Sequence, residues 1–151
     1  MSPETPCPNE YSTFSVIVRK TAISAGLVLL AGGFVFSGVS KLFDFSAATA
    51  EMAHHGLPFP ALMAAAVIVT QLGGSALLIW PRTSWIGAGL LAGFTAMATL
   101  IAHAPWSDAG PIVLPQSVVF LQNAGILGGL LLALAFGARG SIARLIERFR
   151  T

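Results

Sequence analysis

Charged side chains are scarce in this sequence. Only 9% of its 151 residues are Asp, Glu, Lys or Arg, whereas soluble domains average about 25%. A water-facing surface cannot be built from so few charges, so an ordinary soluble globular protein is excluded. The length suits one domain, and apolar segments use almost all of it, which excludes a separate soluble catalytic module.

Cysteine is almost absent as well. Cys7 is the only one, and it lies in a proline-rich stretch near the N-terminus. A single cysteine excludes an internal disulfide and a Cys-x-x-Cys redox pair, so any thiol relay needs a partner protein. Residues 1–18 also lack the apolar core of a secretory signal peptide, and we expect them to form a disordered cytoplasmic tail.

The motifs of hydrolases, phosphate-binding proteins and nucleic-acid-binding proteins are missing too. Asp44, Glu51 and Asp108 lie in predicted loops without local partners, so no catalytic triad or carboxylate pair is expected. The net charge is only +2, and the basic residues stand at the ends of apolar segments, which argues against nucleic acid as a partner. A secondary transporter is disfavoured because no carboxylate lies within an apolar segment.

The sequence is rich in long apolar runs. Residues 21–40 contain no charge and are bracketed by two lysines, which gives about 30 Å of helix, or one bilayer crossing. Similar runs cover residues 61–80 and 85–104, and a fourth begins at residue 112 or 115 and ends at residue 138. The predicted fold is an all-α membrane protein, a bundle of four transmembrane helices embedded in the lipid bilayer.

The basic residues gather on one side of this predicted bundle. Four crossings place both termini and the turn near residue 82 on the same side. That side holds seven of the eight basic residues, Arg19, Lys20, Arg82, Arg139, Arg144, Arg148 and Arg150. Because basic loops stay in the cytoplasm, both termini are predicted to be cytoplasmic, and Lys41 falls on the outer side.

Two shorter segments are predicted to lie at the membrane surface. Residues 44–55 read as an interfacial helix that begins at Asp44 or Ser46 and ends at Gly56. Three of the side chains in and beside it are expected to dip into the headgroup layer: Phe43, Phe45 and Met52. Residues 141–151 alternate apolar and basic side chains, which predicts an amphipathic helix on the inner leaflet; the alternative is a solvated basic tail.

Small residues recur at four-residue spacing within three of the apolar runs. The pairs are Gly33 and Ser37, Gly89 and Gly93, and Gly125 and Gly129. Such pairs let helix backbones approach closely in a membrane. We expect them to pack helices within one chain, and a homo-oligomer interface is the alternative.

Polar residues inside the apolar runs are candidates for function, because a polar side chain in hydrocarbon needs a partner. The candidate ligand-binding residues are Lys41, Gln71, His103, Gln122 and Asn123. The predicted topology lets all five line one cavity open to the outer face. Each has a simpler interpretation: Lys41 can snorkel to the headgroups, Gln71 and Asn123 can join helices by hydrogen bonds, and His103 can lie at the interface.

The three histidines raise the question of a copper or zinc site. His54, His55 and His103 all fall on the predicted outer side. Adjacent residues on a helix point about 100° apart, so at most one of the first two can join His103. No carboxylate or thiolate at ligand spacing completes a set, and no metal site is predicted.

Several segments resemble the DoxX family of bacterial membrane proteins. They are residues 36–44 (FSGVSKLFD), 55–60 (HGLPFP), 71–78 (QLGGSALL) with Arg82, 103–106 (HAPW) and 122–129. Their order and spacing extend the likeness over residues 19–137. The resemblance implies a four-helix domain over residues 19–140 in the bacterial inner membrane, between the tail of residues 1–18 and the basic helix of residues 141–151.

The resemblance also implies a range of functions. Some members of the family are associated with oxidation of thiosulfate or other sulfur compounds coupled to quinone, and others with membrane complexes that handle thiol and oxidative stress. This chain has Gln71 where many relatives carry glutamate and Gln122 where lysine is common. Losing both charges is consistent with a lost ion pair or altered chemistry.

The sequence therefore leads to one main functional hypothesis and two alternatives. The main one is a redox-associated subunit that holds a quinone or another small apolar molecule in the outward-facing cavity. The chain has no intrinsic cofactor, so electrons must come from a substrate or from a soluble or membrane redox partner. The alternatives are a non-enzymatic scaffold that anchors a soluble enzyme, and a small-molecule permease or lipid-handling protein.

Overall fold

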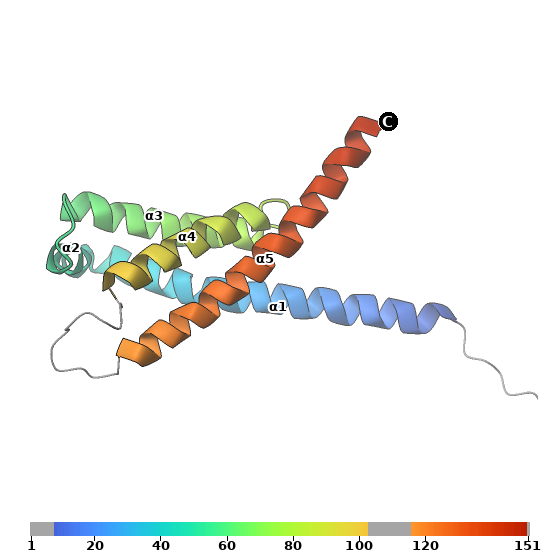
Figure 1. Cartoon of the computed structure of the whole chain (residues 1–151), viewed down its shortest axis with the longest axis horizontal. Helices are drawn as coiled ribbons and strands as arrows, with labels where there is room; N and C mark the ends of the chain where they lie inside the picture. The colour runs from blue at the N-terminus through green and yellow to red at the C-terminus, as the bar shows by residue number, and fades with distance from the viewer. Residues whose placement is uncertain (1–7, 103–115, 151) are drawn as a thin grey trace, which may run out of the picture.

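The computed structural model describes residues 8–102 and 116–150, and the side chains of residues 14–101 and 118–137. The helices are α1 (Pro8–Phe43), α2 (Phe45–His54), α3 (Pro60–Ile79), α4 (Ser84–Ala102) and α5 (Gln116–Arg150), and Figure 1 shows their arrangement. Within these residues the chain has no strand. Four of the helices are long and apolar enough to cross a membrane, which confirms the predicted all-α, four-span fold.

Proline residues set the bounds of α3. Pro60 occupies the first turn of the helix, where its missing N–H costs no hydrogen bond. Trp80 is the extended residue that follows the helix, and Pro81 comes next. The Thr83 hydroxyl donates to the Leu77 carbonyl at 3.0 Å and so satisfies one of the last carbonyls of α3. These signals explain why the predicted bounds of the second and third spans agree with α3 and α4.

Helix α1 begins earlier than predicted. The prediction of a disordered tail through residue 18 is contradicted for residues 8–18, which are helical. Pro8 is suited to the first helical position, and no proline follows it before residue 58. At about 1.5 Å per residue, 36 residues make about 54 Å of helix, so α1 is longer than the hydrocarbon core of a bilayer.

Helix α5 is continuous through Arg150, which corrects the predicted break at residues 137–140 and the separate surface helix over residues 141–151. An interior glycine costs a helix only about 1 kcal/mol relative to alanine, so it does not force an end. A Cβ on Gly137 would lie 3.1 Å from Trp85 Cβ and 3.1 Å from Ser84 Oγ. Gly137 therefore permits close contact with the start of α4 and does not cap the helix.

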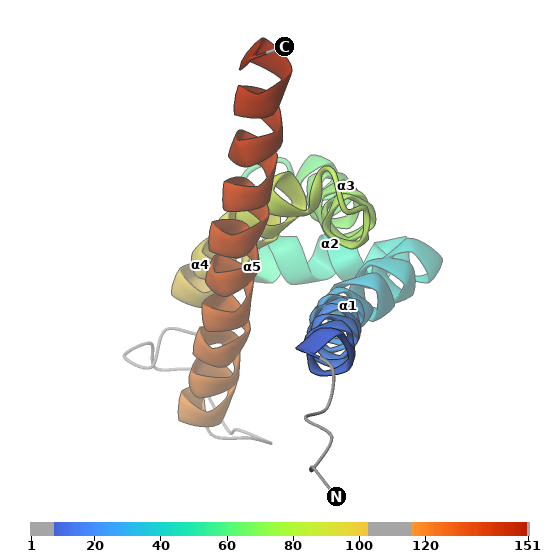
Figure 2. The ribbon, with the colours of Figure 1, turned by 90° about the vertical axis from the view of Figure 1, so that its right-hand side faces the viewer.

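The four long helices pack in the order α1, α3, α4, α5, each mainly against the next. The main contacts join α1 to α3, α3 to α4 and α4 to α5, whereas α1 and α5 touch at few residues. Figure 2 shows α5 running past α4 at a steep angle to α1. The shared core consists of Ala31, Phe34, Leu78, Ala88, Leu91, Ala92 and Leu130. Only 17% of the apolar window of α1 and 6% of that of α5 is buried, so most of their surface suits contact with lipid.

The two ends of the bundle carry different segments. The turn between α3 and α4, the N-terminal part of α1 and the C-terminal part of α5 lie toward one end, and α2 lies at the other (Figure 1). Arg19, Lys20 and Arg82 belong to the first end. The basic residues thus gather as the topology requires, and the assignment of this end to the cytoplasm stays a prediction.

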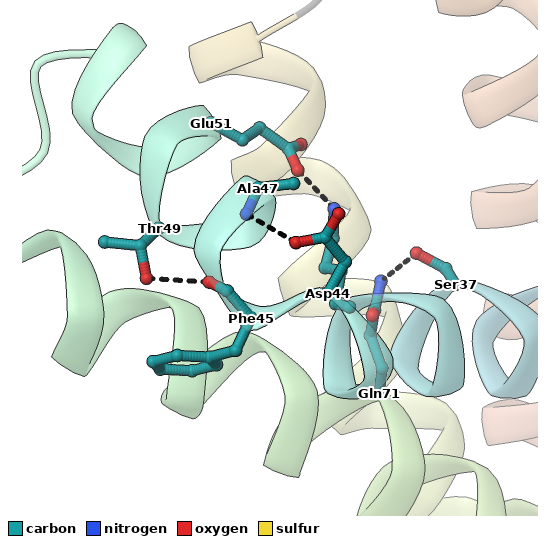
Figure 3. Close-up of polar contacts among 8 residues, drawn as sticks. Ser37, Asp44, Phe45, Ala47, Thr49, Glu51 and Gln71 are labelled. Carbon is teal, nitrogen blue, oxygen red and sulfur yellow. Dashed lines mark hydrogen bonds and ion pairs between the residues drawn. The ribbon is translucent and has the colours of Figure 1, made fainter.

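Helix α2 packs across the end of α3 as a short capping element. Asp44 is its N-cap: the carboxylate accepts from the Ala47 N–H at 3.0 Å and from the Ser46 hydroxyl at 2.8 Å (Figure 3). Gly56 ends the segment with φ +69°, a conformation that glycine adopts without strain.

Met52 of α2 is buried between α2 and α3 with Ala48 and Ala64. This corrects the prediction that its side chain dips into the headgroup layer.

Gly87 of α4 makes a close contact with the backbone of α3. A Cβ there would meet the Leu78 backbone nitrogen, and it would lie 2.6 Å from the Gly74 carbonyl oxygen and 2.7 Å from the Leu77 carbonyl carbon. The space at Gly87 is filled by the backbone of α3, so a side chain cannot be accommodated without separating the two helices. The predicted small-residue pairs do not make this contact.

Replacing Gly87 with alanine is expected to destabilise the protein by about 2 kcal/mol or more, because backbone atoms cannot move aside as side chains do. Thermal unfolding in detergent measures the effect. Gly73→Ala in α3 is the matched control, since a Cβ there meets nothing within 4 Å. Equal melting temperatures for the two variants would contradict the assigned packing.

The Asp44 cap makes a pH prediction. The bonds from the Ala47 N–H and then the Ser46 hydroxyl hold the pKa of Asp44 below its ordinary value. The stability that the cap gives to α2 is therefore fully present above the ordinary aspartate pKa and is lost as the pH falls through the lowered pKa. We expect hydrogen-exchange protection at Ala47 to follow that course, and to be flat with pH in Asp44→Asn. The same acid loss in both proteins would count against the cap.

Candidate functional site

A large cavity lies between the four long helices. Its volume is about 1180 Å³, and α1, α3, α4 and α5 all contribute to its walls, with residues of α2 and the following turn at one end. Its walls are mostly apolar, including the side chains of Phe34, Met63, Val67 and Phe94. Because α1 and α5 both line the cavity but touch at few residues, the cavity extends between them toward the surface that lipid would cover.

Glycine creates much of this space. Gly33 of α1 and Gly93 of α4 line the cavity, and a Cβ on either would meet nothing within 4 Å. Gly26, Gly89 and Gly129 line it as well. The small-residue pairs that were predicted to bring helix backbones together therefore mainly leave room between them. The motif allows both outcomes, since the space left by a small residue is either occupied by a neighbouring helix or stays open.

Gln71 is a buried polar side chain of the cavity wall. It is only 5% exposed, and its Nε2 donates to Ser37 Oγ of α1 at 3.1 Å (Figure 3). Its other amide atom, Oε1, is buried and has no hydrogen-bond partner among the described residues. Gln71 thus joins two helices, as one interpretation predicted, and its unpaired oxygen is buried within the protein.

A salt bridge lies at the α2 end of the cavity. Lys41 Nζ, from the last turn of α1, pairs with Glu51 Oε2 of α2 (Figure 3), and both residues line the cavity. This corrects the prediction that Glu51 has no partner, and it gives Lys41 an inward role. The pair balances its own charge, so this end of the cavity is polar without carrying a net charge.

Four of the five predicted site residues line this one cavity: Lys41, Gln71, Gln122 and Asn123. His103 lies outside the described residues. Sequence analysis missed Ser37, Glu51 and His55, which also line the cavity. A signal existed for the first, since Ser37 is one helical turn before Lys41 and therefore shares its face. Ligand binding by any of these residues stays a prediction.

The histidines do not assemble a metal site within the described part of the chain. His54 and His55 stack edge to face with ring centroids 5.5 Å apart, and of these two rings only His55 lines the cavity. No group of three His, Cys, Asp or Glu side chains in the described residues is placed to hold a metal ion. The site is therefore suited to hydrogen bonding and apolar contact.

Comparison with known proteins agrees with this architecture. The family model named DoxX matches residues 23–104, which include most of α1 and all of α2, α3 and α4. The chain is 29% identical over 110 residues to inner membrane protein YphA of Escherichia coli (strain K12), covering 73% of this chain and 78% of that protein. No solved structure matches the chain. More than half of the chain matches the family model, and the chain belongs to the DoxX family.

Proposed function

We propose that this protein is a multi-pass inner-membrane protein that binds a small, uncharged and mostly apolar molecule in the cavity between its four long helices. The observation that carries the proposal is the cavity itself, which measures about 1180 Å³ and has mostly apolar walls. The polar side chains of Lys41, Gln122 and Asn123 lie on the same walls. Apolar walls with a few polar groups are typical of small-molecule sites.

The size and access of the cavity support this proposal. Ligand sites commonly measure about 300–1,000 Å³, and this one measures about 1180 Å³, which leaves room for a ring system with an apolar tail. The limited contact between α1 and α5 gives a molecule dissolved in the bilayer a route between them. The inner-membrane location of the relative YphA supports the same membrane for this chain.

A quinone is the ligand that would give this protein a redox role. Its carbonyl oxygens accept hydrogen bonds, and Lys41 of α1 and Asn123 of α5 supply donors at the cavity wall. The chain itself supplies no redox cofactor under this proposal, so electrons would pass between the quinone and a donor or partner protein. The salt bridge to Glu51 keeps the Lys41 charge compensated, which suits a neutral ring.

Filling the cavity should abolish binding. In the double variant Gly33→Phe and Gly93→Phe, two aromatic rings enter the empty space, and saturable binding of a short-chain ubiquinone analogue is expected to fall at least about tenfold, since a filled cavity must rearrange to admit a ligand. Equilibrium dialysis in lipid nanodiscs, corrected with empty discs, measures the affinity.

The matched control is the double variant Gly32→Phe and Gly73→Phe. A Cβ at either position also meets nothing within 4 Å, and neither residue lines the cavity. This variant should bind the analogue as the wild type does. Equal losses in both double variants, or no saturable binding to the wild type, would contradict quinone binding at this site.

A scaffold that anchors a soluble enzyme is the second candidate, favoured by one observation. Helix α5 continues to Arg150, 13 residues beyond the apolar span that ends at Gly137. At about 1.5 Å per residue the extension reaches about 20 Å past the span. The sequence of this extension includes Arg139, Arg144, Arg148 and Arg150, which would suit a partner with an acidic face.

Deleting residues 141–151 separates the two candidates. Under the ligand-binding proposal the truncated protein retains its affinity for the quinone analogue, because the described lining of the cavity comes from residues between Gly26 and Gly129. Under the scaffold proposal the deletion abolishes co-purification of a soluble partner from the native membrane. Loss of ligand affinity in a folded truncation would count against the first candidate.

A further inference from the structure

Along α1 the cavity is polar at one end and apolar at the other. The lining residues of α1 recur every three or four positions from Gly26 to Lys41, so they share one face of the helix. At about 1.5 Å per residue this face spans about 22 Å. Ser37 and Lys41 lie in the part nearest α2, whereas the lining residues from Gly26 to Phe34 are all apolar.

Helix α5 repeats this order. It begins toward the end of the bundle that holds α2 (Figure 1), and its lining residues near that end are Gln122 and Asn123. Farther along α5 the lining residues are Ile126 and Gly129. Two helices of opposite direction therefore place their polar side chains at the same end of the cavity. Such an asymmetry fits a molecule that has a polar head and an apolar tail.

Three helices enclose the apolar half of the cavity. Gly89, Leu90 and Gly93 line it from α4. Helix α5 comes close to α1 at this depth, since a Cβ on Gly129 would lie 3.3 Å from Leu30 Cδ2. A tail that lies in this half therefore contacts protein on several sides.

We infer that the cavity binds its ligand lengthwise, with a polar ring at the α2 end and an apolar tail held inside the apolar half as far as Gly26. This inference rests on the proposed function and specifies its ligand class: long-tailed molecules are preferred over short-tailed molecules with the same ring. Lys41 and Asn123 line the polar end as hydrogen-bond donors for the ring oxygens.

Packing gives the tail its preference for the cavity. Lipid chains are as apolar as the cavity walls, so a tail that moves from the bilayer into the protein gains little hydrophobic free energy. A tail that fills the cavity gains dispersion contacts with the walls, and it removes a void that destabilises the fold. The gain therefore depends on how much of the tail fits the apolar half.

The experiment compares decylubiquinone with the analogue that carries an ethyl group on the same ring. Phe34 and Gly26 are separated by about 12 Å along α1, a length that a decyl chain can span and an ethyl group cannot. Affinities are measured on the full-length protein in nanodiscs and corrected for partition into empty discs. We expect the wild type to bind the decyl analogue about tenfold more tightly, because its tail makes many more wall contacts.

Two variants of α1 assign that preference to the far end of the cavity. Gly26 lines the cavity and a Cβ there meets nothing within 4 Å, so Gly26→Phe should remove the preference for decyl. It should retain affinity for the ethyl analogue, which also shows that the variant is folded. Gly32→Phe is the matched control: its Cβ also meets nothing within 4 Å, but Gly32 does not line the cavity. This control should keep the tenfold preference.

Photolabelling of the wild type locates the tail without any variant. The probe is decylubiquinone with a diazirine at the end of its tail, and mass spectrometry identifies the labelled residues. Labels that excess unlabelled decylubiquinone removes are expected near Gly26 of α1 and Leu90 of α4. Such labels near Lys41, or only on residues outside the cavity, would overturn the lengthwise orientation.

The outcomes separate this inference from the proposed function. If the wild type binds neither analogue saturably, the proposed function fails. If it binds both equally after correction, the cavity holds the ring but the tail inference is wrong. A decyl preference that persists in Gly26→Phe would also overturn it, because the tail would then lie elsewhere. If Gly26→Phe binds neither analogue, the labelled positions in the wild type decide.

Discussion

The hydrogen bond from Gln71 Nε2 to Ser37 Oγ links α1 to α3 within an apolar surrounding, and the candidate site depends on it. No water competes for such a bond in a membrane interior, so the pair holds the two helices in register. The same bond places Gln71 and Ser37 together on the cavity wall. One interaction therefore serves the fold and shapes the candidate site.

Glycine divides the bundle into a packed half and an open half. Because Gly87 has no side chain, the backbones of α3 and α4 can meet there. This contact joins the two central helices of the bundle. At Gly33 and Gly93 a missing side chain leaves space, and α1 and α5 remain apart around the cavity. The salt bridge between Lys41 and Glu51 then ties α2 across the end of that space.

Local signals made the fold predictable from the sequence. The features that depend on neighbouring helices could not be predicted in this way. Pro60 and Pro81 mark the ends of α3, and Asp44 marks the start of α2. Gly137 looks like a helix end in sequence, but its role is set by its contact with α4. The pairing of Lys41 with Glu51 joins different helices, and no periodicity within one helix reveals it. That four of the polar candidates line one cavity could still be predicted, because polar side chains are rare in apolar runs.

An experimental structure in lipid nanodiscs, purified without added ligand, tests the central claim most directly. The account predicts density for a small molecule between α1 and α5, with an apolar body between Gly33 and Gly93. A bundle in which α1 and α5 close against each other, with no space left between Gly33 and Gly93, would contradict it.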